Sequence, residues 1–171
     1  MKKILSALLL LLTIGEAKGT ELLSNDLDCL ATNAYFEANT QSLAGQIAIV
    51  LVVLNRVKSE KFPNTICEVV LEGPVRESWK TRKDKTLTDD ERIFYPVKNR
   101  CQFSWYCDGV KDVINNREIW LDIKIHIEEF LDTERYDFTE GSIHYHAYYV
   151  SPEWADEKKL TTIIGDHLFY R

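Results

Sequence analysis

The spacing of apolar residues along the chain predicts a mainly helical protein. Between residues 27 and 38, apolar side chains recur three and four positions apart, as on one face of an amphipathic helix. Residues 43–57 are apolar on nearly every face and long enough for a buried helix, which we expect to be the central element of the domain. A short helix is predicted at residues 65–70 and a third long helix at residues 112–131.

Two shorter stretches alternate in a way that predicts strands. Residues 101–105 would place Gln102 and Ser104 on one face and aromatic residues on the other. Residues 142–150 would place two histidines on one face and the tyrosine between them on the opposite face. With the helices, these strands predict an α+β fold that is mainly helical.

Residues 73–100 are polar and show no regular period. They predict a long surface insertion, with a short helix starting at about Asp89. A long loop in a compact domain usually has a function or is mobile, and a solvated insertion without a function is the alternative. With this insertion included, residues 20–171 have the length of a single domain.

The first 19 residues have the pattern of a secretory signal peptide. Two lysines precede a short apolar run, and the small residues Ala17 and Gly19 suit cleavage after Gly19. The run is shorter than the roughly 20 apolar residues that span a bilayer as a helix, although an uncleaved membrane anchor is the alternative. We therefore predict an exported protein of the periplasm or cell wall, with no stable membrane span after processing.

Cleavage after Gly19 would leave 18 basic and 26 acidic side chains, a net charge of −8. Nucleic-acid-binding proteins present basic surfaces, so we expect no nucleic-acid partner. All four cysteines would remain in an oxidising compartment, where an even number predicts two disulfides. Three pairings are open, and a bridge between Cys101 and Cys107 requires a tight turn between them. A zinc site of four cysteines lacks the usual close spacing.

Glu37 lies between aromatic and small residues at the end of the first predicted helix, directly before the buried run. Burial against a core raises the pKa of a carboxyl group, so that the group can donate a proton near neutral pH. A carboxylate at a helix C-terminus also opposes the helix dipole, so stability alone does not favour glutamate there. We predict that Glu37 is a catalytic acid; the alternative is a structural glutamate that faces water.

Several motifs surround this glutamate in the sequence. In chain order they are Ala34-Tyr35-Phe36-Glu37-Ala38, Asn55-Arg56-Val57, Phe62-Pro63-Asn64-Thr65-Ile66-Cys67, Gln102-Phe103-Ser104-Trp105, residues 141–147, residues 150–155 and residues 165–171. Together they resemble the SleB-like cell wall hydrolase family, which includes spore-cortex-lytic enzymes. The resemblance extends over about residues 27–171, apart from the insertion. It implies a lysozyme-like fold, a peptidoglycan substrate, and a single catalytic glutamate at Glu37.

The chain departs from this family where the family commonly has a second glutamate. The family pattern Glu-Ala-Arg-Gly-Glu corresponds here to residues 37–41, which end in Gln41. Hydrolysis of a glycosidic bond usually needs two carboxylates, whereas one carboxylate can act as acid and then as base when a hydroxyl of the sugar itself attacks. We therefore predict a lytic transglycosylase that cleaves between N-acetylmuramic acid and N-acetylglucosamine. Asp108 and Glu153 are the remaining candidates for a second carboxylate.

Six further side chains are predicted to bind the glycan: Tyr35, Gln102, Ser104, His144, His146 and Tyr148. The polar ones could hydrogen-bond sugar hydroxyl or acetamido groups, and the aromatic ones could stack on sugar rings; packing in the core is the alternative for the aromatic ones. We expect peptidoglycan glycan strands as the partner, no cofactor and no metal, and a monomer.

Two other classes of protein compete with this interpretation. A zinc-dependent peptidoglycan amidase or endopeptidase would use His144, His146 and His167 as metal ligands. An exported carbohydrate-binding module would need no catalytic group, so that Glu37→Gln would leave its function intact.

Overall fold

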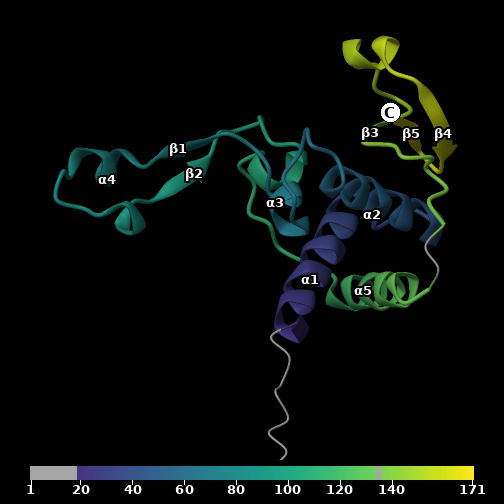
Figure 1. The fold of residues 1–171 in the computed structure, drawn as a ribbon, viewed down its shortest axis with the longest axis horizontal. Helices are drawn as coiled ribbons and strands as arrows, with labels where there is room; N and C mark the ends of the chain where they lie inside the picture. Colours follow the sequence, from purple (N-terminus) through teal and green to yellow (C-terminus); the bar gives the residue numbers. More distant parts are fainter. Residues whose placement is uncertain (1–18, 134–135) are drawn as a thin grey trace, which may run out of the picture.

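A layer of helices forms the body of the molecule (Figure 1). The structure, a computed structural model, describes residues 19–133 and 136–171. Its longer helices are α1 (Gly19–Ala38), α2 (Leu43–Val57) and α5 (Arg117–Leu131), and short α3 (Ile66–Val70) lies beside α1 and α2. The predicted signal peptide lies outside the described residues except for Gly19, so it stays a prediction. No helix in the described ranges is long and apolar enough to cross a membrane.

Helix α2 is the central element, as predicted. Every residue from position 45 to position 53 is buried, because α1, α3 and α5 surround this helix. Ser42 begins α2 as its N-cap, with its Oγ accepting a hydrogen bond from the amide of Gly45. Helix α1 contributes Ala31 and Ala34 to the core, and these small side chains let the neighbouring helices approach closely.

Helix α5 begins at Arg117, five residues later than the sequence pattern predicts. The side chain of Asn116 accepts hydrogen bonds from the amides of Glu118 and Ile119, at 3.1 and 3.2 Å, and so caps the first turn. Apolar residues before this cap belong to the preceding loop, so their spacing extended the predicted helix too far.

A three-stranded antiparallel sheet follows the helices along the chain. It consists of β3 (His144–Ala147), β4 (Leu160–Ile164) and β5 (His167–Tyr170) in the order β3-β5-β4, with the 3-10 helix η3 (Glu153–Glu157) between β3 and β4. The predicted strand at 142–150 is therefore confirmed but shorter. Phe169 of β5 is fully buried against residues of α2, which joins the sheet to the helical layer.

The strand predicted at residues 101–105 is wrong. Residues Ser104–Cys107 form a 3-10 helix, η2, and this tight turn brings Cys107 to Cys101. The second disulfide joins Cys29 to Cys67 and ties α1 to α3. Trp105 does not stand on a strand face but stacks on Phe36 of α1, with the ring centroids 4.7 Å apart.

The insertion is an ordered arm that extends away from the helical body (Figure 1). It contains β1 (Val75–Glu77), α4 (Trp79–Lys83), the 3-10 helix η1 (Asp89–Glu91) and β2 (Phe94–Pro96). Strands β1 and β2 pair with each other in a separate two-stranded sheet. The predicted short helix near Asp89 is confirmed, whereas the paired strands were not predicted.

Candidate active site

Glu37 lies in the last turn of α1 and its side chain faces the three-stranded sheet. The hydroxyl of Tyr145, in β3, donates a hydrogen bond to Glu37 Oε2 at 2.8 Å. Glu37 Oε1 has no hydrogen-bond partner among the described residues, and it is not one of the fully buried polar atoms that lack a partner. One carboxylate oxygen is thus held by the protein while the other is open to a ligand.

The surroundings of Glu37 favour its protonated form. Burial raises the pKa of Glu37 above its ordinary value of 4.5, and the hydrogen bond from Tyr145 and the charge of Arg56 only partly oppose this effect. Burial and the nearby Glu37 carboxylate raise the pKa of Tyr145 well above its ordinary value, so that its hydroxyl remains a donor. Glu37 can therefore keep a proton to higher pH than an ordinary surface glutamate.

Arg56, near the C-terminus of α2, is a buried cation that reaches this site. Its Nε donates to the carbonyl oxygen of Ile143 at 2.8 Å, and its guanidinium lies 5.0 Å from the ring centroids of Phe62 and Phe103. Its charge favours the ionised forms of both Glu37 and Tyr145. Arg56 thus supplies positive charge to the site and holds the residue that precedes β3.

Asn55, the neighbour of Arg56, fixes the segment that leads into β3. Its Nδ2 lies 2.9 Å from Asp137 Oδ2, 3.4 Å from Thr139 Oγ1 and 3.2 Å from the carbonyl oxygen of Ser142. Asn55 and Arg56 thus interrupt the apolar pattern of α2, and their hydrogen bonds hold the segment before β3 like a clamp. The clamp positions β3, and with it the hydroxyl of Tyr145, over Glu37.

Gln41 occupies the position of the second glutamate in the family pattern, but its side chain is engaged away from Glu37. Gln41 Nε2 donates to Asp166 Oδ2 at 2.9 Å, and the amide of Asp166 donates to Gln41 Oε1 at 3.1 Å. Gly165, with φ of 56°, lies so close to Gln41 Oε1 that a β-carbon there would clash. The Gln41 side chain therefore joins the loop after α1 to the turn between β4 and β5.

Neither of the other two candidate carboxylates is hydrogen-bonded to Glu37 among the described residues. Asp108 Oδ1 accepts a hydrogen bond from the amide of Val110 at 2.6 Å, and Glu153 is exposed at the start of η3. Within residues 26–133 and 136–171, Tyr145 and Arg56 are the side chains that act on the Glu37 carboxyl group. The described site thus combines the Glu37 carboxyl group with one phenol and one guanidinium, and a further carboxylate, Glu72, acts on that guanidinium.

The two predicted histidines lie on the face of β3 opposite Tyr145, because neighbouring side chains of a strand alternate. Both contact Trp154, with ring centroids 5.5 Å from His144 and 5.7 Å from His146. Burial lowers the pKa of His144 to about 4, with help from nearby positive charge, so this ring is neutral at neutral pH. The pair forms a wall with Trp154 on the other side of the strand from Glu37.

The remaining predicted binding residues are placed differently from one another. Tyr35 is buried in the core and its hydroxyl accepts a hydrogen bond from the amide of Asn116 at 3.1 Å. Gln102 and Ser104 are exposed beside and within η2 and do not share a strand face. Tyr148 is exposed just after β3. Tyr145 and Arg56 were not among the predicted site residues. The polar break in the apolar pattern of α2 is a local signal for Arg56, whereas the alternation in β3 does not show which of its two faces meets Glu37.

The three histidines of the zinc alternative do not converge. In the pairing of β3 with β5, His167 stands opposite Ala147 and therefore shares the face of Tyr145, not that of His144 and His146. His146 is also occupied on both ring nitrogens: Nδ1 donates to the carbonyl oxygen of Ala147, and Nε2 accepts from the hydroxyl of Tyr170, each at 2.9 Å. No group of three metal-ligating side chains occurs in the part of the chain that is described.

Residues 40–170 match the family model described as Cell Wall Hydrolase, and the chain belongs to this family. Its relatives include the spore cortex-lytic enzyme of Bacillus cereus, 42% identical over 48 residues, and that of Bacillus subtilis (strain 168), 43% identical over 49 residues. These segments cover 28% and 29% of this chain, but only 18% and 16% of the two relatives. The family match starts just after Glu37, so the interpretation of Glu37 rests on its geometry.

A solved structure shares the fold. The catalytic domain of the germination-specific lytic transglycosylase SleB from Bacillus anthracis has a TM-score of 0.59 to this chain, with 21% sequence identity. The alignment covers 92% of this chain and 98% of that domain. The predicted SleB-like family and the mainly helical, lysozyme-like α+β fold are therefore confirmed.

Proposed function

We propose that this protein cleaves the glycan strand of peptidoglycan between N-acetylmuramic acid and N-acetylglucosamine, as a lytic transglycosylase. The observation that carries the proposal is the half-satisfied carboxyl group of Glu37: Oε2 accepts a hydrogen bond from Tyr145, and Oε1 has no partner within the described residues. Membership of the cell wall hydrolase family supports the choice of polymer.

Glu37 first acts as a general acid. Its protonated carboxyl group donates the proton to the oxygen that links the two sugars, and the bond from this oxygen to C1 of the muramic acid breaks with its electron pair on the oxygen. Positive charge develops at C1 while Glu37 becomes a carboxylate. The hydrogen bond from Tyr145 and the charge of Arg56 both favour that carboxylate, so the site stabilises the negative charge that the first step creates on Glu37.

Glu37 then acts as a general base. Its carboxylate accepts the proton of the C6 hydroxyl of the same muramic acid, and O6 forms a bond to C1. The product is a 1,6-anhydro sugar, no water is consumed, and Glu37 regains its proton. A hydrolytic enzyme usually has a second carboxylate as base or nucleophile; the engagement of Gln41 with Asp166 supports the route that needs only one.

The proposed substrate lies outside the cytoplasmic membrane, so this activity requires export. The predicted signal peptide and the two disulfides support a location in the periplasm or the cell wall.

Mass spectrometry of peptidoglycan fragments tests the proposal. Purified peptidoglycan would be incubated with the wild type, with Glu37→Gln and with the matched control Glu153→Gln, which removes an exposed carboxylate. We expect anhydro-muropeptides from the wild type and the control, and none from Glu37→Gln. Products with reducing ends only would show hydrolysis, and release of free peptides would overturn the assignment to the glycan strand.

A further inference from the structure

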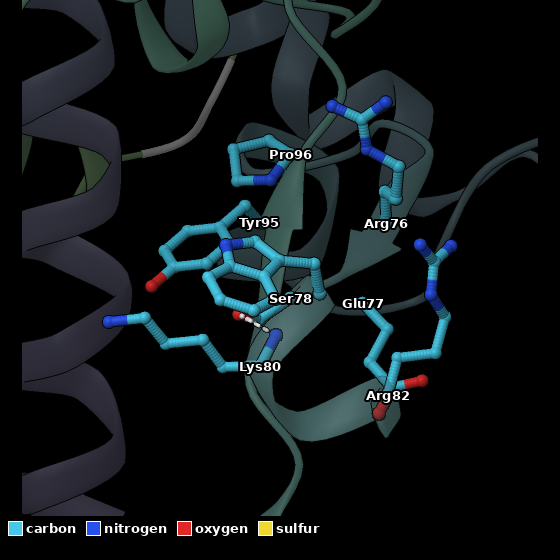
Figure 2. A pocket seen from close by; sticks show the side chains of 8 residues that line it. Arg76, Glu77, Ser78, Lys80, Arg82, Tyr95 and Pro96 are labelled. Carbon is cyan, nitrogen blue, oxygen red and sulfur yellow. Dashed lines mark hydrogen bonds between the residues drawn. The ribbon is translucent and has the colours of Figure 1, made fainter. Parts of the chain in front are cut away.

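A cavity of about 480 Å³ lies on the arm. In Figure 1 the arm and the three-stranded sheet lie on opposite sides of the helical body. The residues that matter for its chemistry are Arg76, Glu77, Trp79, Lys80, Arg82 and Tyr95. Figure 2 shows Lys80 and Tyr95 reaching to one side of this cavity and Arg76 and Arg82 to the other. The cavity is separate from Glu37, and the cleavage mechanism makes no use of it.

The arm is basic although the protein is acidic. Residues 73–100 contain eight Lys or Arg and five Asp or Glu side chains, a net charge of +3, whereas the whole chain has a net charge of −6. The single carboxylate of the cavity, Glu77, is paired with Arg92 at 2.8 Å. Arg76, Lys80 and Arg82 form no ion pair with a carboxylate among the described residues. The cavity therefore presents three cations that an anionic ligand could neutralise.

Two aromatic rings stand beside these cations without packing in a core. Trp79 is 60% exposed and Tyr95 is 58% exposed. Arg76 and Tyr95 are direct partners across the two strands of the arm, so their side chains project from the same face. Exposed aromatic residues next to arginine are typical of binding surfaces.

Backbone contacts give this surface a defined shape. The amide of Ser78 donates to the carbonyl oxygen of Ile93 at 2.7 Å, which joins the start of α4 to the opposite branch of the arm. Ser78 Oγ accepts from the amide of Lys80 at 3.4 Å and caps α4. The cations and rings are thus carried on a hydrogen-bonded scaffold, which reduces the ordering that binding requires.

We propose that the arm is a second peptidoglycan-binding site that takes a carboxylate-bearing stem peptide of the wall polymer. This inference rests on the proposed function, because it assigns a further contact to the same polymer. The carboxylates of the peptide pair with Arg76, Arg82 and Lys80, and its apolar parts or the adjoining sugar face lie against Trp79 and Tyr95. Stem peptides recur along a glycan strand, so one polymer can occupy the arm and the Glu37 site together and gain affinity from both.

Co-sedimentation with insoluble peptidoglycan tests this site. Every protein would carry Glu37→Gln, so that the polymer stays intact during the measurement. We expect the added double substitution Arg76→Gln/Arg82→Gln to weaken binding about tenfold, as loss of charge-assisted hydrogen bonds at an exposed site would. The control is Arg100→Gln, which removes an exposed cation of the arm outside the cavity and should leave binding unchanged.

The chemistry of the ligand is tested by converting the peptide carboxylates of the polymer to amides. Binding of the protein with an intact arm should then fall to the level of the double variant. Equal binding by both proteins to untreated peptidoglycan would overturn the inference. The inference would also be overturned if the double substitution weakened binding to duplex DNA as much as binding to peptidoglycan, since the arm would then attract any polyanion.

The two proposals fail in different ways. If the wild type releases no anhydro-muropeptides but the Glu37→Gln protein binds peptidoglycan through Arg76 and Arg82, the proposed function is wrong and the arm site stands. If the wild type cleaves and the double variant binds normally, the arm site is wrong and the proposed function stands. Urea unfolding should show equal stability for these variants, because both arginines are exposed.

Discussion

Replacing Tyr145 by phenylalanine removes only the hydroxyl group that donates to Glu37 Oε2 at 2.8 Å. The ring would keep its contacts with His167 and Phe169, whose centroids lie 5.3 and 5.7 Å away. The substitution therefore separates the hydrogen bond to Glu37 from the packing of β3. In the proposed mechanism this bond strengthens during the first step, because its acceptor changes from a neutral carboxyl group to a carboxylate.

The expected loss of rate follows from that change in the acceptor. A neutral hydrogen bond contributes about 0.5–1.5 kcal/mol and one to a charged group about 1.5–3 kcal/mol, so the transition state gains roughly 1–1.5 kcal/mol more from Tyr145 than the ground state does. This difference corresponds to a rate about 5- to 13-fold lower for Tyr145→Phe. The hydrogen bond also lowers the pKa of Glu37, so its removal should raise that pKa. Because Glu37 must start protonated, the loss of activity at alkaline pH should move to higher pH.

The assay is the initial rate of release of soluble anhydro-muropeptides from peptidoglycan, measured across the pH range. The control is Tyr170→Phe, which removes another tyrosine hydroxyl from the same sheet; this hydroxyl is hydrogen-bonded to His146 and does not contact Glu37. The control should leave the alkaline limb of the pH profile unchanged. A Tyr145→Phe variant with the wild-type rate and pH profile would refute the argument that this hydroxyl stabilises the Glu37 carboxylate.

Two further predictions concern stability. Burial raises the folded-state pKa of Glu37 above 4.5, so the stability associated with its protonated form is complete below the unfolded pKa and is lost as the pH rises through the folded pKa. The side chain of Glu37→Gln cannot ionise, so the unfolding free energy of this variant should rise relative to that of the wild type between acidic and neutral pH. The expected rise is about 1.4 kcal/mol for each unit by which folding raises the pKa of Glu37. A difference between the two proteins that stays constant in urea unfolding at several pH values would contradict this. Gln41→Glu, which introduces the glutamate that the resemblance predicts at this position, would set a carboxylate against Asp166 Oδ2 in place of the amide that donates to it. It should lower stability by about 1–2 kcal/mol at neutral pH and by more than Gln41→Ala does; equal losses in thermal unfolding would exclude repulsion as the cause.

The long periodic elements could be predicted from the sequence, because their patterns extend over several turns. The apolar run of α2 is long enough for a buried helix rather than a strand, and Ser42 supplies its cap. The stretch at 101–105 shows where such reasoning fails. Five alternating residues suit a strand or a short turn equally well, and the disulfide between Cys101 and Cys107 selects the turn. The arm was not predicted as strands, since three-residue strands are too short to show a period.

The candidate active site was only half predictable for a related reason. Glu37 could be selected from its own neighbours in the sequence, because a carboxylate beside a buried run is locally unusual. Its partner Tyr145 could not be selected in this way, since the alternation in β3 defines two faces of the strand but does not show which face meets α1. That choice depends on the clamp by which Asn55 and Arg56 hold residues 137–143, more than 80 positions away in the chain. The polar interruption of α2 is therefore the local signal of a long-range contact, and in this fold it decides that Tyr145, and not the histidines beside it, faces Glu37.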